Sequence, residues 1–216
     1  MPTDRDTKAR VVAAASALFA ERGFHGTTVR DIAQRARVNL AAGHYHFGSK
    51  ETLYLEVLRA QFADIMAEFE QRGARLAAGR KRPGPAALRE LLHARVAAML
   101  ELLLGPPPGL HGTLMMREMC DPSAALPDII DQFIQPHKRE MEAIVSGLLP
   151  QLRREQVEHC VFSIVGQVFF YRQMQPALRL MFRRRALDRA WLLGVAAHIT
   201  EFSLGGMQRI AARGAR

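Results

Sequence analysis

Three side chains between residues 28 and 50 have types that bind phosphates. Thr28 offers a hydroxyl and an amide at the expected start of a helix, where an anion is favoured. Arg30 follows two residues later, within reach of a phosphate or a groove edge. Lys50 falls in the first turn of another expected helix, where the dipole disfavours a cation. A phosphate partner explains Lys50 better than the helix does, although the Lys50-Glu51 pair also fits ordinary surface charge.

A second group could face the bases of a nucleic acid. Asn39 is a plausible N-cap for a short helix over residues 40–47 and could still touch a phosphate. Within that helix His44 is the best candidate for a direct base contact, as donor or acceptor, and a solvated histidine is the alternative. Tyr45 could give its phenol to a phosphate while its ring packs, or be plain core. Gly43 departs from a good helix, at a cost of about 1 kcal/mol relative to Ala, and either lets the backbone approach the groove or leaves a base contact missing.

The elements that must hold these residues are helices joined by tight corners. Apolar residues recur at helical spacing between residues 7 and 22, and Gly23 ends that helix. Thr28 and Asp31 form a shortened capping box for a helix over 29–36. Two short helices meeting at a corner, here 29–36 and 40–47, are the parts of a helix-turn-helix, whose second helix enters the major groove. The apolar residues that could fill this three-helix core are Phe19, Phe24, Ile32, Val38, Leu40, Phe47 and Leu53.

The rest of the chain also predicts helices, so the expected fold class is all-α. Further helices are expected over 86–104, 113–120, 124–149, 153–175 and 187–209, with Pro122, Pro136, Pro150 and Pro176 as stops or kinks. We expect a helix-turn-helix DNA-binding domain over residues 1–50. A helical domain for effector binding and dimerisation is expected over residues 51–216.

Composition narrows the class of protein. The net charge of +9 suggests a polyanionic partner, and 49% hydrophobic residues allow a sizeable core. Two cysteines make a disulfide framework improbable and fit a reducing cytoplasm. The apolar stretch over residues 11–20 is flanked by Asp4, Asp6 and Glu21, which argues against a signal peptide, and no run is long enough to span a membrane.

The sequence favours no enzyme. It contains no G-x-S-x-G, no glycine-rich phosphate loop and no H-E-x-x-H. His159 and Cys160 are adjacent, so on a helix they point about 100° apart and cannot hold one metal ion from the same face. We therefore expect no catalytic residues, no metal site and no cofactor.

The N-terminal segment resembles the DNA-binding domain of TetR-type repressors. The resemblance covers residues 8–58 and is carried by GFHGTTVRDIA over 23–33 and YHFGSKETL over 45–53. It implies a regulator that binds operator DNA through this segment. The expected DNA-binding residues are Thr28, Arg30, Asn39, Leu40, Ala41, Gly43, His44, Tyr45 and Lys50.

The C-terminal segment more loosely resembles the branch of that family with a CecR-type C-terminal domain. The matching stretches are Arg117-Glu118, Pro122, 133–136, 144–149 and 163–176. The resemblance implies a ligand-binding and dimerisation domain and leaves the ligand open. We expect a small hydrophobic or amphipathic effector of unknown identity. An apolar cavity with a few polar groups is needed, although any single Met or Phe fits a plain core as well. The expected effector-binding residues are Met99, Met115, Arg117, Glu118, Phe133, Phe162, Gln167, Phe170 and Tyr171.

A homodimer is expected, because a palindromic operator needs two recognition helices about 34–36 Å apart. The apolar helices over 157–174 and 187–209 could pair across a two-fold axis into a four-helix bundle. The predicted function is a cytoplasmic, ligand-released repressor without membrane association. A sequence-independent DNA-packaging protein is the rival, and an activator remains open because activation depends on where the operator lies. Arg183-Arg184-Arg185 is expected in a solvated loop or, alternatively, in a second nucleic-acid patch.

Overall fold

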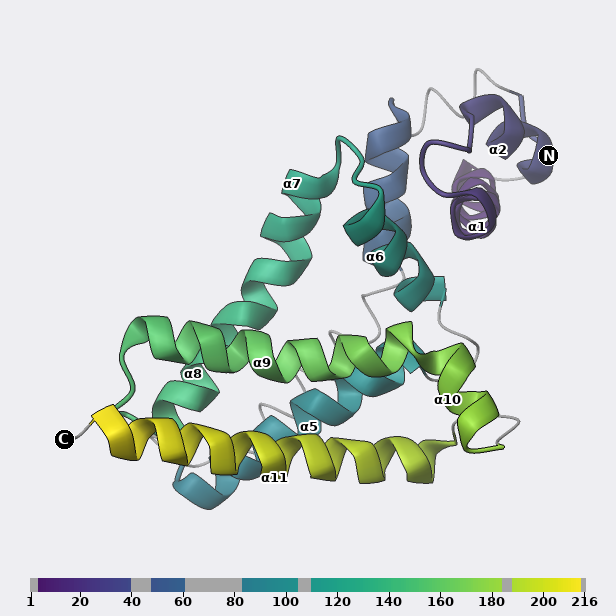
Figure 1. Ribbon diagram of the computed structural model, residues 1–216. Coiled ribbons are helices and arrows are strands. Elements are labelled where there is room, and N and C mark those ends of the chain that lie inside the picture. Colours follow the sequence, from purple (N-terminus) through teal and green to yellow (C-terminus); the bar gives the residue numbers. More distant parts are fainter. Residues whose placement is uncertain (1–3, 40–47, 61–82, 105–109, 184–187, 215–216) are drawn as a thin grey trace. The chain divides into compact units, whose positions relative to one another are not determined.

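The computed structural model describes residues 4–39, 48–60, 83–104, 110–183 and 188–214, and the elements in these ranges are helical (Figure 1). The chain forms two compact units. Unit 1 comprises Met1–Asp64 and Leu110–Phe133, and unit 2 comprises Ile65–Gly109 and Ile134–Arg216. Each unit is therefore made of two separate stretches of the chain. The expected boundary at residue 50 divides the chain by function, into a DNA-binding part and an effector-binding part, and stays a prediction. Within the described ranges no helix is long and apolar enough to cross a bilayer.

Unit 1 begins with the two helices expected from the sequence. Helix α1 runs over Asp4–Arg22 and ends at Gly23, whose φ of 76° suits a residue without a side chain. Helix α2 runs over Val29–Ala36, and Thr28 caps it. The capping box with Asp31 is confirmed: the Asp31 amide donates to Thr28 Oγ1 at 3.1 Å, and the Thr28 amide donates to Asp31 Oδ2 at 3.0 Å.

An aromatic cluster fills the core beside α1. Phe19 and Phe24 pack against Tyr54, which lies on the helical residues 50–60, with ring centroids 4.9 and 5.1 Å from the tyrosine ring. Phe19, Phe24, Ile32 and Leu53 of the predicted core are buried, whereas Val38 is half-buried. Leu40 and Phe47 lie outside the described residues. The buried rings fix how the helix after Lys50 packs against α1.

Arg10 joins α1 to the end of α2. Its Nη2 donates to the carbonyl oxygens of Ala36 and, at 2.9 Å, of Arg37. Arg37 takes the left-handed conformation that ends α2, with φ 54° and ψ 48°. A cation at this place satisfies carbonyls that the helix leaves without partners and complements the negative end of its dipole.

We expect Arg10→Met to lower the free energy of unfolding by about 1–2 kcal/mol, because two hydrogen bonds from a charged donor are lost. Urea denaturation at neutral pH measures this loss. Arg22→Met removes the same charge from the exposed end of α1 and is the matched control. Equal stabilities of the two variants would contradict the role given to Arg10.

Unit 1 is completed by three helical segments from the middle of the chain. Helix α6 runs over Leu110–Cys120, α7 over Leu126–Ile129, and the π-helix η1 over Ile130–Ile134, of which only the last residue belongs to unit 2. Helix α6 packs against α1. The sequence predicted one continuous helix over 124–149. In the structure this stretch is interrupted by the wider π-helical turn of η1, which ends two residues before Pro136. A proline has no amide to donate and its ring crowds the carbonyl four residues earlier, which explains the irregular turn.

Unit 2 is a bundle around one apolar core. It contains α5 (Pro85–Leu104), α8 (Gln135–Leu148), α9 (Arg154–Gln173), α10 (Gln175–Met181) and α11 (Arg189–Gly214). Helix α5 packs against α8, α9 and α11 (Figure 1). Leu92, Val96 and Leu100 are fully buried there. Helix α10 was not expected from the sequence, in which Pro176 was interpreted as a stop or kink, although proline is well suited to a first helical turn.

An ion pair between a buried arginine of α5 and an exposed glutamate of α8 lies beside a histidine, and this arrangement predicts a pH dependence. Arg95 is 9% exposed and pairs with Glu140 at 2.8 Å, and His137 Nδ1 lies 3.7 Å from the same carboxylate oxygen. Burial lowers the pKa of His137 below its usual 6.5, and the charge of Arg95 acts in the same direction, while Glu140 opposes both.

The unfolded chain therefore takes up this proton at a higher pH than the folded protein does. The contribution of His137 to stability is present above pH 6.5 and is lost as the pH falls through the lowered folded pKa. We expect the urea midpoint to fall between about pH 7.5 and 5.5, and to fall less in His137→Gln, which cannot take up that proton. An identical fall in both proteins would contradict this assignment.

Candidate nucleic-acid interface and effector region

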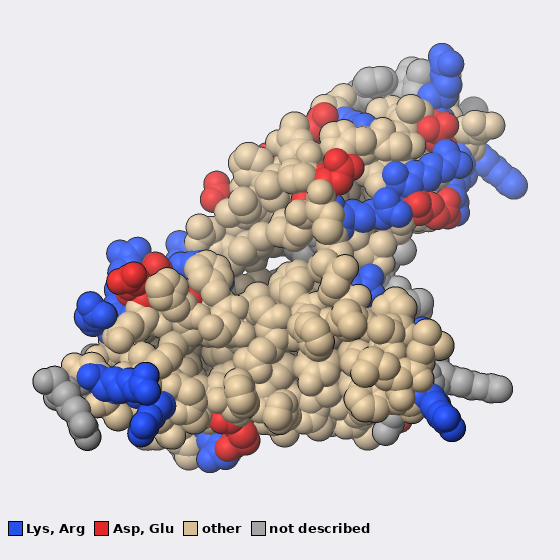
Figure 2. Space-filling view, in the orientation of Figure 1, with Lys and Arg blue, Asp and Glu red and all other residues tan. Residues whose placement is uncertain are grey.

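The structure places three of the expected DNA-binding residues on the surface of unit 1. Thr28 lies at the start of α2, Arg30 in its first turn and Asn39 after its end, and all three are exposed. Leu40, Ala41, Gly43, His44 and Tyr45 lie outside the described residues. Lys, Arg, Asp and Glu side chains stand together over the part of the view where Figure 1 places α1 and α2 (Figure 2).

Thr28 is already engaged within the protein. Its hydroxyl donates to Asp31 Oδ2 at 2.6 Å, and its amide donates to the same oxygen. These bonds from Thr28 hold the pKa of the Asp31 carboxyl below its usual value. Thr28 therefore fixes the first turn of α2, and its contact with a phosphate stays a prediction.

Lys50 has a partner that the sequence analysis missed. Its Nζ donates to the carbonyl oxygens of Phe24 at 3.0 Å and Thr27 at 3.2 Å, and lies 4.1 Å from the centroid of the Phe24 ring. The lysine thus ties the helix after it to the turn between α1 and α2, which explains a cation in that first turn. An ammonium group has three hydrogens, so one more remains for a phosphate.

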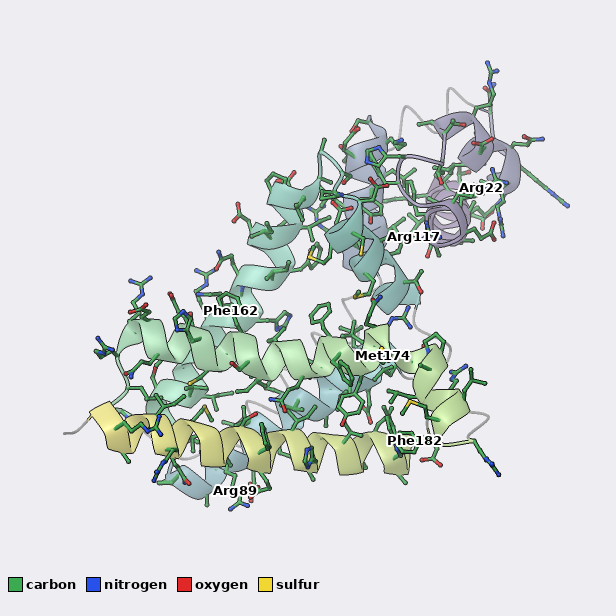
Figure 3. All side chains as sticks on the ribbon, viewed as in Figure 1. Arg22, Arg89, Arg117, Phe162, Met174 and Phe182 are labelled. Carbon is green, nitrogen blue, oxygen red and sulfur yellow. The ribbon has the colours of Figure 1, made fainter. Side chains whose placement is uncertain are left out.

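The charge pair at positions 117 and 118, expected to bind effector, splits between two environments in unit 1. Arg117 is exposed, and its Nη2 donates to the Glu21 carbonyl at 3.1 Å (Figure 3). Glu118 is 2% exposed, and its Oε1 accepts from the amide and the hydroxyl of Ser123, both at 2.9 Å. Burial raises the pKa of Tyr54, and Glu118, to which the phenol is hydrogen-bonded, raises it further. Helix α6 is thereby joined to both α1 and the helix after Lys50.

The remaining expected effector residues lie in both units. Phe133 is half-buried in η1 of unit 1, and the Met115 side chain lies outside the described residues. In unit 2, Met99 packs at the edge of the core, and Tyr171 packs edge-on against Trp191 at 5.7 Å between ring centroids.

Three of the expected effector-binding residues on α9 have different surroundings: Gln167 bonds to a neighbouring helix, whereas Phe162 and Phe170 are exposed. Gln167 Nε2 donates to Ser203 Oγ of α11 at 3.1 Å, so this polar group serves helix packing. Phe162, labelled in Figure 3, is 58% exposed, and Phe170 is 55% exposed. Such exposure is unusual for phenylalanine, which is most often buried. Their predicted role in binding an effector stays untested.

A surface depression lies elsewhere in unit 2. It has a volume of about 370 Å³ and is formed by α8, α9 and the turn between them. None of the nine expected effector residues lines it; its lining is Glu142, Ala143, Ser146, Leu152, Arg154 and Val157. In the part of the chain that the structure describes, no three His, Cys, Asp or Glu side chains gather in a way that could hold a metal ion.

Comparison with known proteins finds a family match for two segments of the chain. Residues 11–57 match the family of bacterial regulatory proteins named tetR, and residues 88–207 match the C-terminal domain of the HTH-type transcriptional dual regulator CecR. The CecR regulator of Shigella flexneri is 34% identical over 144 residues, which cover 65% of this chain and 63% of that protein. The chain thus spans less than two thirds of that relative.

Two further comparisons also find proteins named as regulators. The regulator RutR of Escherichia coli is 29% identical over 177 residues, covering 78% of this chain and 75% of that protein. A fatty acid metabolism regulator from Clostridium perfringens shares the fold, with a TM-score of 0.65, 18% identity, and coverage of 91% and 97% of the two chains. The matching families and relatives are transcriptional regulators, not enzymes. The chain belongs to the TetR family of bacterial regulatory proteins and carries the CecR-type C-terminal domain.

Proposed function

We propose that this protein is a DNA-binding transcriptional regulator that binds a palindromic operator as a homodimer and is released by a small effector. The observation that carries the proposal is the TetR-type segment over 11–57, in which α2 is capped by Thr28 and held to α1 by Arg10. A helix held in this way braces the following segment against DNA. The protein would act in the cytoplasm, where its operator is.

The proposed DNA contacts divide by chemistry. Arg30 and Lys50 supply charge to phosphates, whereas the segment over 40–45, with His44 as its best reader, faces the bases. Asn39 and Tyr45 add contacts to the backbone. Because phosphate contacts carry no sequence information, Arg30→Gln should weaken binding to all duplexes, whereas His44→Ala should change the preference among them.

The proposed dimer rests on unpaired apolar surface on two neighbouring helices. Phe162 and Phe170 of α9 and Phe202 of α11 are more than half exposed. The face over α9 and α11 is mostly uncharged in Figure 2. Two such helices per subunit form a four-helix bundle across a two-fold axis.

The proposed release is a two-state change. An effector bound by the C-terminal part shifts the helix that begins at Lys50, and the shift alters the spacing of the two recognition segments. Support comes from the contacts of Glu118 and Arg117 within unit 1, which join α6 to that helix and to α1. Repression is the more direct outcome of such release, and the matched CecR relative is named a dual regulator.

The test is to select bound duplexes from a random pool with the purified full-length protein. We expect an enriched inverted repeat, bound at least about a thousandfold more tightly than random DNA at physiological salt. A screen of amphipathic compounds for release of that duplex follows. Equal affinity for all duplexes across a salt series would instead favour the DNA-packaging alternative.

A further inference from the structure

The corner between α9 and α10 brings three hydrogen-bonding side chains together in unit 2. Helix α9 ends at Gln173, and α10 begins at Gln175 after Met174, which Figure 3 labels. At this corner Arg172 Nη1 donates to Gln175 Oε1 at 3.0 Å. Arg179, one helical turn beyond Gln175, lies close enough for its charge to act on Arg172. We call Arg172, Gln175 and Arg179 the arginine corner.

The arginine corner has more donors than acceptors. Gln175 is 8% exposed, its oxygen accepts from Arg172, and its buried Nε2 has no hydrogen-bond partner among the described residues. The buried Nε of Arg179 also lacks a partner there. Guanidinium groups have donors and no acceptor, so neither arginine can accept from Gln175 Nε2 or Arg179 Nε. These two buried donors therefore lack an acceptor. Buried donors without acceptors cost free energy and are rare in folded proteins.

The charges at the corner lead to the same conclusion. Burial lowers the pKa of Arg172, and the neighbouring cation of Arg179 lowers it further. Within the described ranges no carboxylate pairs with Arg179, although ion pairs are common elsewhere in unit 2, as in Arg89–Glu201 and Arg189–Glu101. A cation at Arg179 beside two donors without partners favours an acceptor that carries negative charge, which would satisfy the donors and offset the cation.

We propose that the arginine corner binds an oxyanion, the carboxylate or phosphate group of a small ligand. An oxyanion offers only acceptors and accepts from guanidinium groups and amides in charge-assisted hydrogen bonds. The proposal deepens the proposed function and rests on it for the regulatory consequence: it narrows the effector from hydrophobic or amphipathic to anionic. Binding itself can be tested without DNA.

The first experiment measures the thermal midpoint of the full-length protein with sodium octanoate, with octan-1-ol as the uncharged match, and with inorganic phosphate. Sodium chloride keeps the ionic strength constant. We expect one of the two anions to raise the midpoint by at least about 3 °C at saturation, because a ligand that binds only the folded state stabilises it. Octanoate alone would identify an alkyl carboxylate, and phosphate alone a phosphate ligand.

Variants locate the effect. Arg179→Gln should weaken binding of the effective anion by about tenfold or more, since a charged hydrogen-bond donor is lost. Arg139→Gln removes the same charge from an exposed position of α8, where Arg139 Nε donates to the Gln135 carbonyl of the same helix, and should bind like the natural protein. Equal weakening in both variants would show a general charge effect and overturn the proposal.

Gln175→Glu keeps the proposal testable if an arginine variant fails to fold. It puts a carboxylate between the two arginines, so we expect a higher midpoint without ligand and no further rise with the anion. A retained anion response in Gln175→Glu, or no response of the natural protein to either anion, would overturn the proposal.

The regulatory consequence is tested separately with the selected operator. Release by the effective anion, reduced in Arg179→Gln, supports an anionic effector. An anion that binds at the corner but leaves operator affinity unchanged would contradict the effector role and leave the binding site intact. Failure to find an operator would contradict the proposed function, while the thermal measurements would still decide the arginine corner.

Discussion

Glu118→Ala should lower the free energy of unfolding by about 3 kcal/mol, because it removes the acceptor of two buried donors on Ser123 and a partner of Tyr54. A buried donor without an acceptor costs about 1–3 kcal/mol, and cavity formation adds to the loss. The loss is a large share of the stability of a domain, which is about 5–15 kcal/mol. Urea denaturation followed by circular dichroism measures it.

Glu118→Gln is the matched control. Its amide oxygen can still accept from Ser123, and its volume is nearly unchanged, so the expected loss is smaller, about 1 kcal/mol. Glu118→Ala and Glu118→Gln with equal stability would show that the carboxylate oxygens do not hold the turn after α6. The position would then be explained by packing alone.

A double-mutant cycle separates the tyrosine from the serine. Tyr54→Phe removes the phenol that faces Glu118 and leaves the contacts with Ser123 intact. We expect a coupling energy of about 1–2 kcal/mol between Tyr54→Phe and Glu118→Gln, because the two side chains share one network. The same variants should reduce the response of operator binding to effector if α6 passes the signal to the helix after Lys50.

Local features of the fold were predictable from the sequence, because their partners lie three or four residues apart. The capping box of Thr28 and Asp31 is one example, and the glycine end of α1 is another. Both follow from backbone geometry and short side chains. The family motif added the arrangement of α1 and α2, which local rules alone do not give.

Long-range partners were not predictable in this way. Lys50 suggested a phosphate because its backbone carbonyl partners, on Phe24 and Thr27, stand more than 20 residues earlier. Arg117 and Glu118 were both expected to bind effector, whereas the structure exposes Arg117 and buries Glu118. Tyr54, whose phenol is hydrogen-bonded to the buried Glu118, lies in a different helix. The arginine corner was not predicted because Pro176 was interpreted as a stop or kink and not as part of the first turn of α10.

Phe202→Glu should convert the protein to a monomer and weaken operator binding by about a hundredfold or more. Phe202 of α11 is 67% exposed, and Phe162 and Phe170 of the adjacent α9 are exposed as well. In a four-helix bundle a carboxylate at this position would lose its water without gaining a partner. A monomer would also lose the gain in affinity from binding two half-sites at once.

Leu180→Glu is the control that gives this test its specificity. Leu180 is 81% exposed, more than Phe202, but lies on α10 and outside the two helices proposed to pair. Sedimentation at micromolar concentration should show a monomer for Phe202→Glu and a dimer for both Leu180→Glu and the natural protein. If exposure alone governed association, Leu180→Glu would dissociate first. A Phe202→Glu protein that stays dimeric would place the dimer interface away from this part of α11, because a buried carboxylate without a partner cannot be tolerated at a two-fold axis, where it occurs twice.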